Sequence, residues 1–90
     1  QVLIRDADGH VVARADFLWR AQRVVGEVDG KVKYVGPRAD SLWREKRRQE
    51  AVEDAGFVVV RWGAFELATP AALDQRIRRA FEQAARRRVA

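Results

Sequence analysis

The amino-acid sequence predicts an α/β domain with a mixed four-stranded sheet in the order βββαβα. The first third of the chain has three runs of alternating apolar and polar residues joined by turn residues, a pattern typical of an antiparallel meander. A helical stretch is followed by a continuous apolar run, and the chain ends in a second helical stretch with an apolar stripe. A strand, a helix and a buried strand in succession predict a parallel crossover connection.

The first two strands are expected over residues 1–5 and 10–19, with Asp8-Gly9 in the turn between them. Asp-Gly between two β-prone runs is a strong hairpin signal. In the second run, every other residue from Val11 to Trp19 is apolar, so these side chains are expected on one face. A third strand is expected over residues 23–34, with valines and glycines on one face and charged residues on the other.

The middle of the chain predicts a helix followed by a buried strand. Asp40 or Ser41 can cap a helix that runs to about residue 55, and Gly56 can occupy the position just after its end. The apolar run at 57–62 is typical of a strand buried on both faces.

The last helix is expected to begin at Thr69-Pro70, with Thr69 as N-cap and proline in the first turn. Asp74 and Arg78 are spaced for an ion pair on its surface. Its apolar stripe consists of Leu73, Ile77, Ala80, Phe81 and Ala84.

Length and composition limit the possible functions. Ninety residues predict a single domain over 1–90, and a chain that begins with Gln1 and lacks Met is expected to be a C-terminal part of a longer protein. The absence of Cys excludes disulfides and thiolate chemistry, and a single His is too few for a His-rich metal site. No apolar run is long enough for a signal peptide or membrane span, so a cytoplasmic location without a membrane partner is expected. A net charge of +5 favours a polyanionic partner.

Three carboxylates are expected to converge on the polar face of the second hairpin. If that hairpin closes at residues 21–22, Asp16 lies opposite Glu27, with Cβ atoms roughly 4.5–5.5 Å apart, and Asp29 follows on the same face. Clustered carboxylates repel one another unless a divalent cation or basic side chains compensate them. Mg²⁺ takes oxygen ligands, and Lys31 beside it would orient water or stabilise phosphate. This set suits metal-assisted phosphodiester hydrolysis.

A simpler interpretation is also open, because the outer face of an antiparallel hairpin is normally charged. Arg14 across from Asp29 would then be an ordinary cross-strand ion pair. The following helix has the polar residues Glu45, Arg48 and Gln49 on or near its inward side. Either these side chains point toward the carboxylates, or Glu45 simply pairs with one of the other two.

The chain resembles, over about residues 2–87, the PD-(D/E)XK nuclease superfamily. Within it, the chain is similar to a branch of bacterial domains that groups with very-short-patch-repair endonucleases. Domains of this branch often end larger proteins, including some similar to abortive-infection antitoxins. The resemblance rests on four stretches in order, namely RADFLW at 14–19, EVDGK at 27–31, EKRR at 45–48 and GFVVVRW at 56–62.

The resemblance implies a restriction-endonuclease-like fold with the core order αβββαβ, whose first helix would precede Gln1. It implies Asp16 as the first metal carboxylate and Glu27 as the acidic residue of the second motif, with Mg²⁺ or Mn²⁺ as cofactor. The second motif can be matched as Glu27-Val28-Asp29, with Asp29 in the usual lysine position, or as Asp29-Gly30-Lys31. Both alignments place the same residues on one face. The implied metal ligands are Asp16, Glu27 and Asp29, and Lys31 completes the implied catalytic set.

The resemblance also gives the helix a role, with Glu45, Arg48 and Gln49 as supporting site residues. Basic residues near the same place can contact phosphates without reading sequence, although they are equally typical of a solvated helix face. The residues expected to contact DNA are Lys33, Arg44 and Arg47.

Together these features predict a metal-dependent endonuclease-like domain that hydrolyses DNA phosphodiester bonds, of a mismatch-repair or defence type. Its expected partners are DNA and the remainder of the parent chain. The alternative is a catalytically inactive nuclease fold that serves as a DNA-binding or regulatory module of a toxin–antitoxin-like protein. A protein-interaction domain in such a protein is a third possibility, since fold does not by itself determine function.

Overall fold

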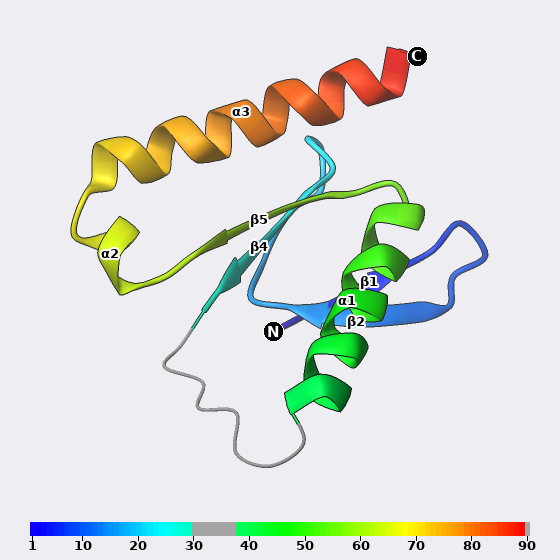
Figure 1. Ribbon diagram of the computed structural model, residues 1–90. Coiled ribbons are helices and arrows are strands. Elements are labelled where there is room, and N and C mark those ends of the chain that lie inside the picture. Colours follow the sequence, from blue (N-terminus) through cyan, green and yellow to red (C-terminus); the bar gives the residue numbers. More distant parts are fainter. Residues whose placement is uncertain (30–37, 90) are drawn as a thin grey trace.

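The computed structural model describes residues 1–29 and 38–89 (Figure 1). They form a mixed α/β domain with two small sheets and three helices, which confirms the predicted class. The strands are β1 (Val2–Arg5), β2 (Val11–Ala15), β3 (Phe17–Trp19), β4 (Val24–Val28) and β5 (Val58–Trp62). The helices are α1 (Arg38–Asp54), α2 (Ala64–Leu67) and α3 (Pro70–Val89).

The single four-stranded sheet was a wrong prediction. The antiparallel pair β1–β2 forms one sheet, and β3, β4 and β5 form another in that order. The strand expected over 10–19 is divided by a bend at Asp16, whose Oδ2 accepts a hydrogen bond of 2.9 Å from the amide of Val28. A side chain that binds the neighbouring backbone competes with regular strand pairing. The expected common face is therefore lost, and Ala15 and Trp19 pack in different cores.

The crossover and the second hairpin follow the prediction. β3 and β4 are antiparallel, with Phe17 opposite Gly26. β4 and β5 are parallel, with Val24 beside Val58, and α1 lies between them in the chain. Of the third predicted strand, β4 accounts for the first part, and residues 30–34 lie outside the described residues.

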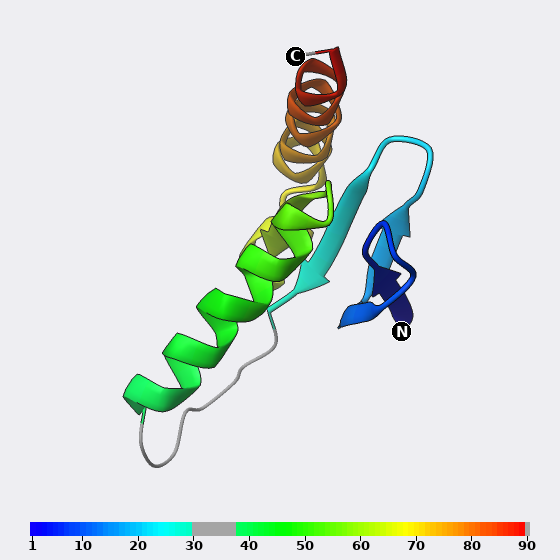
Figure 2. The same cartoon turned by 90° about the vertical axis from the view of Figure 1, so that its right-hand side faces the viewer.

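Two hydrophobic cores lie on opposite sides of the three-stranded sheet. Figures 1 and 2 show α3 on one side and α1 with the β1–β2 pair on the other. β4 belongs to both cores, because Val24 and Val25 are completely buried and point in opposite directions. The first core contains Ile4, Ala13, Ala15, Val25, Val52 and Phe57. The second contains Val24, Val58, Val60, Trp62, Ala80 and Ala84, with Trp19, Leu73, Ile77 and Phe81 packed against it, as the predicted stripe of the last helix required.

The end of α1 is closed as the sequence indicated. Gly56 has a φ of +99°, the left-handed conformation that glycine adopts most readily. The guanidinium of Arg23 donates a hydrogen bond of 2.9 Å to the carbonyl of Ala55 and lies 4.1 Å from the centre of the Phe57 ring. Arg23 thus satisfies a carbonyl at the helix end and stacks on the first core.

The start of α3 confirms Pro70 but changes the expected role of Thr69. The Thr69 carbonyl accepts the first helical hydrogen bonds, from Ala72 at 3.0 Å and Leu73 at 3.2 Å. Its hydroxyl donates instead to the carbonyl of Phe65, at 3.2 Å, and so joins α3 to the short helix α2, which was not predicted. No helix among the described residues is long and apolar enough to cross a membrane.

The turn between β1 and β2 depends on the side chain of Asp6. Its Oδ1 accepts hydrogen bonds of 2.9 Å from the amides of Asp8 and His10. The bond from His10 is the largest cause that lowers the pKa of Asp6 below its ordinary value. Since the folded pKa is the lower one, the stabilising effect is present above the ordinary value and is lost as the pH falls through the folded pKa.

We therefore expect the amide resonances of Asp8 and His10 to move together when the protein is acidified through the pKa of Asp6. An NMR pH titration measures this. In Asp6→Asn, which carries no titrating carboxylate, the same two amides should not show this transition. Constant amide shifts in the wild type down to the onset of acid unfolding would contradict the role assigned to Asp6.

Candidate functional site

The two acidic residues of the second hairpin are neighbours, as predicted. The register of Phe17 with Gly26 places Asp16 and Glu27 next in line on the two strands. Asp29 follows directly after β4, where its amide donates a hydrogen bond of 2.7 Å to the carbonyl of Trp62. The three carboxylates therefore start from one end of the three-stranded sheet.

The polar side of α1 faces these strands. Glu45 and Arg48 are three residues apart and are joined by a hydrogen bond of 3.2 Å. Arg48 also reaches Glu27, with 2.6 Å between Nη2 and Oε1, and donates to the carbonyl of Arg14. Both interpretations left open for this helix are realised, because Glu45 pairs with Arg48 and Arg48 points toward the carboxylates. The simpler interpretation paired Arg14 with Asp29, but Asp29 pairs instead with an arginine of β5, Arg61.

The sequence analysis missed Arg61 of β5, which lies at the centre of the cluster. Its Nη2 is 2.5 Å from Glu45 Oε1, its Nη1 is 3.4 Å from Asp29 Oδ1, and its Nε is 3.2 Å from Gln49 Oε1. Burial alone would lower the pKa of Arg61, but the hydrogen bond and charge of Glu45, with the charges of Glu27 and Asp29, raise it above the ordinary value. A lone arginine in an apolar strand was the available signal, since a buried charge needs a partner.

Glu27 has the least exposed side chain among the carboxylates that form ion pairs in the described residues. Its side chain is 12% exposed, against 57% for Asp29. Although Arg48 lies close enough to compensate its charge, Oε1 of Glu27 is buried and accepts no hydrogen bond from the described residues. A buried oxygen without a hydrogen bond normally has a further partner.

The cluster formally carries four carboxylates, of Asp16, Glu27, Asp29 and Glu45, against two guanidinium groups. Counted over the described residues, the cluster has an excess of negative charge, and this excess and the Glu27 oxygen fit a divalent cation, which prefers oxygen ligands. We define these four carboxylates with Arg48, Gln49 and Arg61 as the carboxylate–arginine cluster.

A second acidic group lies at the β1–β2 turn, where ligand atoms of Asp6, Asp8 and His10 lie within 4.8 Å of one another. Asp6 already accepts backbone hydrogen bonds there, which accounts for its position. Exposed acidic side chains gather in turns without a metal, so this group does not indicate a cation site.

The residues expected to contact DNA are only partly described. Arg44 and Arg47 are exposed on α1, and the guanidinium of Arg47 lies 5.7 Å from the centre of the Trp43 ring. Neither arginine has an ionic partner in residues 1–29 and 42–88. Lys31 and Lys33 lie outside the described residues.

Comparisons of the chain with protein-family models, curated proteins and solved structures give no match. The chemistry of the carboxylate–arginine cluster therefore carries the functional argument.

Proposed function

We propose that this domain is a restriction-endonuclease-like, metal-dependent nuclease that hydrolyses DNA phosphodiester bonds, of a mismatch-repair or defence type. The observation that carries the proposal is Glu27, whose buried Oε1 accepts no hydrogen bond from the described residues and whose backbone position follows from the register as the neighbour of Asp16. A cation would relieve the repulsion between the carboxylates and would give Glu27 Oε1 a ligand in addition to its ionic contact with Arg48.

Mg²⁺ or Mn²⁺ would be held by Asp16 and Glu27, with Asp29 as the third carboxylate. When bound, such a cation supplies an activated water and neutralises charge on the phosphate oxygens. Arg48 and Arg61 hold the carboxylates in place, since each of them contacts Glu45 and one strand carboxylate.

DNA would lie along the exposed basic side of α1. Arg44 and Arg47 are free to contact the phosphate backbone, and such contacts set position rather than sequence preference. The sequence assigns Lys33 the same phosphate-contacting role. It assigns Lys31 the role of stabilising the reacting phosphate or orienting water.

Titration with Mg²⁺ and Mn²⁺ by calorimetry tests the proposal, together with cleavage of supercoiled plasmid. We expect binding to the wild type, and loss of both binding and cleavage in the double variant Glu27→Gln with Asp29→Asn. Glu50→Gln is the matched control, because Glu50 is an exposed carboxylate of α1 outside the cluster. Absence of metal binding and of cleavage in the wild type would contradict the proposal.

One observation favours the second candidate, a catalytically inactive nuclease fold that binds DNA. Arg48 lies 2.6 Å from the Glu27 oxygen and so provides positive charge where a metal would. In that case calorimetry detects no metal binding and the plasmid is not cleaved. DNA binding nevertheless persists in the presence of chelator and weakens steeply with increasing salt concentration.

A further inference from the structure

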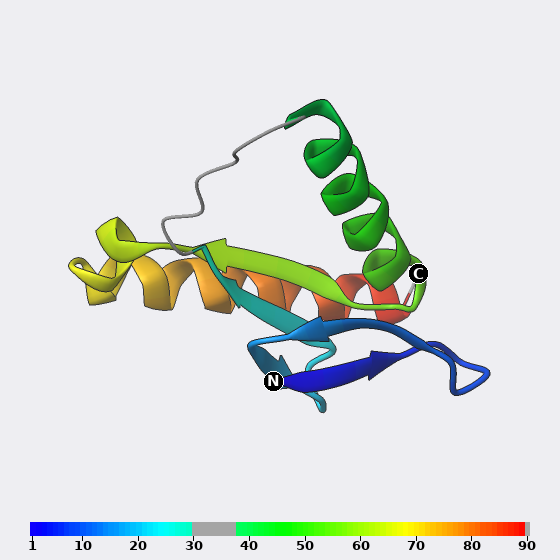
Figure 3. The same cartoon turned by 90° about the horizontal axis from the view of Figure 1, so that it is seen from below.

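Among residues 1–29 and 38–89, no strand pairs with the outer edge of β5, which lies in a groove lined by three arginines. β5 is the last strand of the sheet, and Figure 3 shows it at the margin, with α1 and α3 beside it. A groove of about 370 Å³ runs along the strand here. It is lined by residues 58–61 of β5, by Gln49 of α1 and by Arg76, Arg79, Ala80 and Gln83 of α3.

The backbone of β5 presents donors and acceptors to this groove. The amide of Val58 donates a hydrogen bond to the backbone carbonyl of Arg23, and the carbonyl of Trp62 accepts one from the amide of Asp29. The backbone groups of residues 58 and 62 therefore face β4. Backbone groups alternate in direction along a parallel strand, which turns the amides and carbonyls of Val59 and Arg61 outward. No hydrogen bond from the described residues reaches these four groups.

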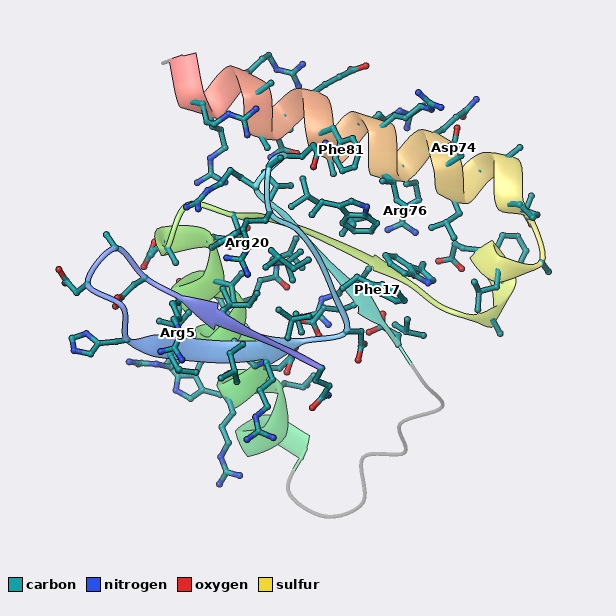
Figure 4. All side chains as sticks on the ribbon, turned by 180° about the vertical axis from the view of Figure 1, so that it is seen from behind. Arg5, Phe17, Arg20, Asp74, Arg76 and Phe81 are labelled. Carbon is teal, nitrogen blue, oxygen red and sulfur yellow. The ribbon has the colours of Figure 1, made fainter. Side chains whose placement is uncertain are left out.

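The lining of the groove contains three arginines and no carboxylate. Two of these arginines are already paired with carboxylates outside the lining, Arg61 with Glu45 and Asp29, and Arg76 with Glu66. Arg61 projects toward α1, and Figure 4 shows Arg76 projecting from α3 toward the strands. Arg76 binds Glu66 at 3.0 Å, whereas Arg79 has no ionic partner among residues 1–29 and 42–88. A chain that lies along β5 would therefore meet Arg79 as the arginine of the lining whose charge is not compensated by another residue of these ranges.

We propose that an extended acidic peptide segment of a partner protein binds in this groove as an additional strand beside β5. Such strand addition derives its affinity from main-chain hydrogen bonds and its selectivity from side chains along the groove. The partner's backbone supplies both the acceptors and the donors that Val59 and Arg61 require. Its carboxylates pair with Arg79 first, since Arg79 has no ionic partner described.

Two other occupants fit the same surface less well. A nucleic acid phosphate would accept hydrogen bonds from the two amides, but the outward carbonyls of Val59 and Arg61 would repel it. A second copy of this chain, paired edge to edge through β5, would bring two arginine-lined grooves together and would supply no carboxylate from either lining to pair with Arg79. An acidic peptide satisfies the hydrogen-bonding groups and the charge together.

Fluorescence anisotropy with a labelled octapeptide of alternating Thr and Glu tests the proposal. We expect saturable binding, and a loss of about tenfold or more when four successive central residues are N-methylated, because the peptide then cannot donate to β5 from either edge. Hydrogen exchange at the amides of Val59 and Arg61 should slow when the unmodified peptide binds.

Arg79→Glu should weaken the binding by a similar factor, while Arg86→Glu should leave it unchanged. Arg86 is an exposed arginine of the same helix outside the groove, so the two variants change the charge equally. Equal binding of the N-methylated peptide would overturn strand addition. Displacement of the peptide by a DNA duplex with loss of DNA binding in Arg79→Glu, or peptide-independent dimers through β5, would assign the groove to nucleic acid or to a second copy.

Discussion

Arg61→Leu should lower the free energy of unfolding by about 1–2 kcal/mol. The substitution removes the guanidinium that contacts Glu45, Asp29 and Gln49, and leaves Glu45 and Glu27 with Arg48 as their shared cation. The side chain of Arg61 is 27% exposed, so solvent screens part of this loss and keeps it below that of a fully buried pair. Urea denaturation followed by circular dichroism measures the change.

Arg76→Leu is the matched control for this prediction. In the part of the chain that the structure describes, Arg76 pairs with one carboxylate, that of Glu66, and is 42% exposed; surface pairs of this kind contribute about 0–1 kcal/mol. If the two variants unfold at the same urea concentration as the wild type, Arg61 is not the organising cation of the carboxylate–arginine cluster.

Gly26→Ala should destabilise the protein by about 1–3 kcal/mol, because the site has no room for a methyl group. An added Cβ would lie 2.7 Å from Cη2 of Trp62 and 2.8 Å from Cζ3 of Trp19. Trp62 is only 5% exposed and is held in the second core, so its ring has little freedom to move. The space beside this glycine is occupied by the two indole rings. Thermal unfolding followed by tryptophan fluorescence measures the loss.

The double variant Gly26→Ala with Trp19→Leu tests the cause of that loss. Leucine removes one of the two rings, so the double variant should lose less stability than the sum of the single variants. Strict additivity of the two changes would show that the ring contacts are not the source of the strain.

Local patterns predicted the parts of the fold that depend on local chemistry. Gly9, with a φ of +87°, lies in the turn between β1 and β2, and Gly56 follows the end of α1, where the turn and cap signals placed them. The apolar run at 57–62 became the parallel strand β5, because a strand covered on both faces needs apolar residues throughout. The antiparallel register that brings Asp16 beside Glu27 also followed from the position of the second turn.

Long-range contacts decided what the sequence did not predict. Period-two alternation continues unbroken through Asp16, so nothing in the local sequence marks the bend, which is stabilised by the amide of Val28 in the adjacent strand β4. Arg61 was hidden in an apolar run, and its importance depends on Glu45 and Gln49 of a helix. The four-residue helix α2 is too short to show a periodicity at all.

The double burial of β4 couples the two halves of this small molecule. Val24 is buried in the core beneath α3, and Val25 is buried in the core beneath α1 and the β1–β2 pair. If the elements on one side of the sheet separate from it, they expose β4, on which the elements of the opposite side also pack. The β1–β2 pair and α3 do not touch the same face, yet each stabilises the surface against which the other packs. Unfolding is therefore expected to be a single cooperative event in which loss of either layer opens the whole domain.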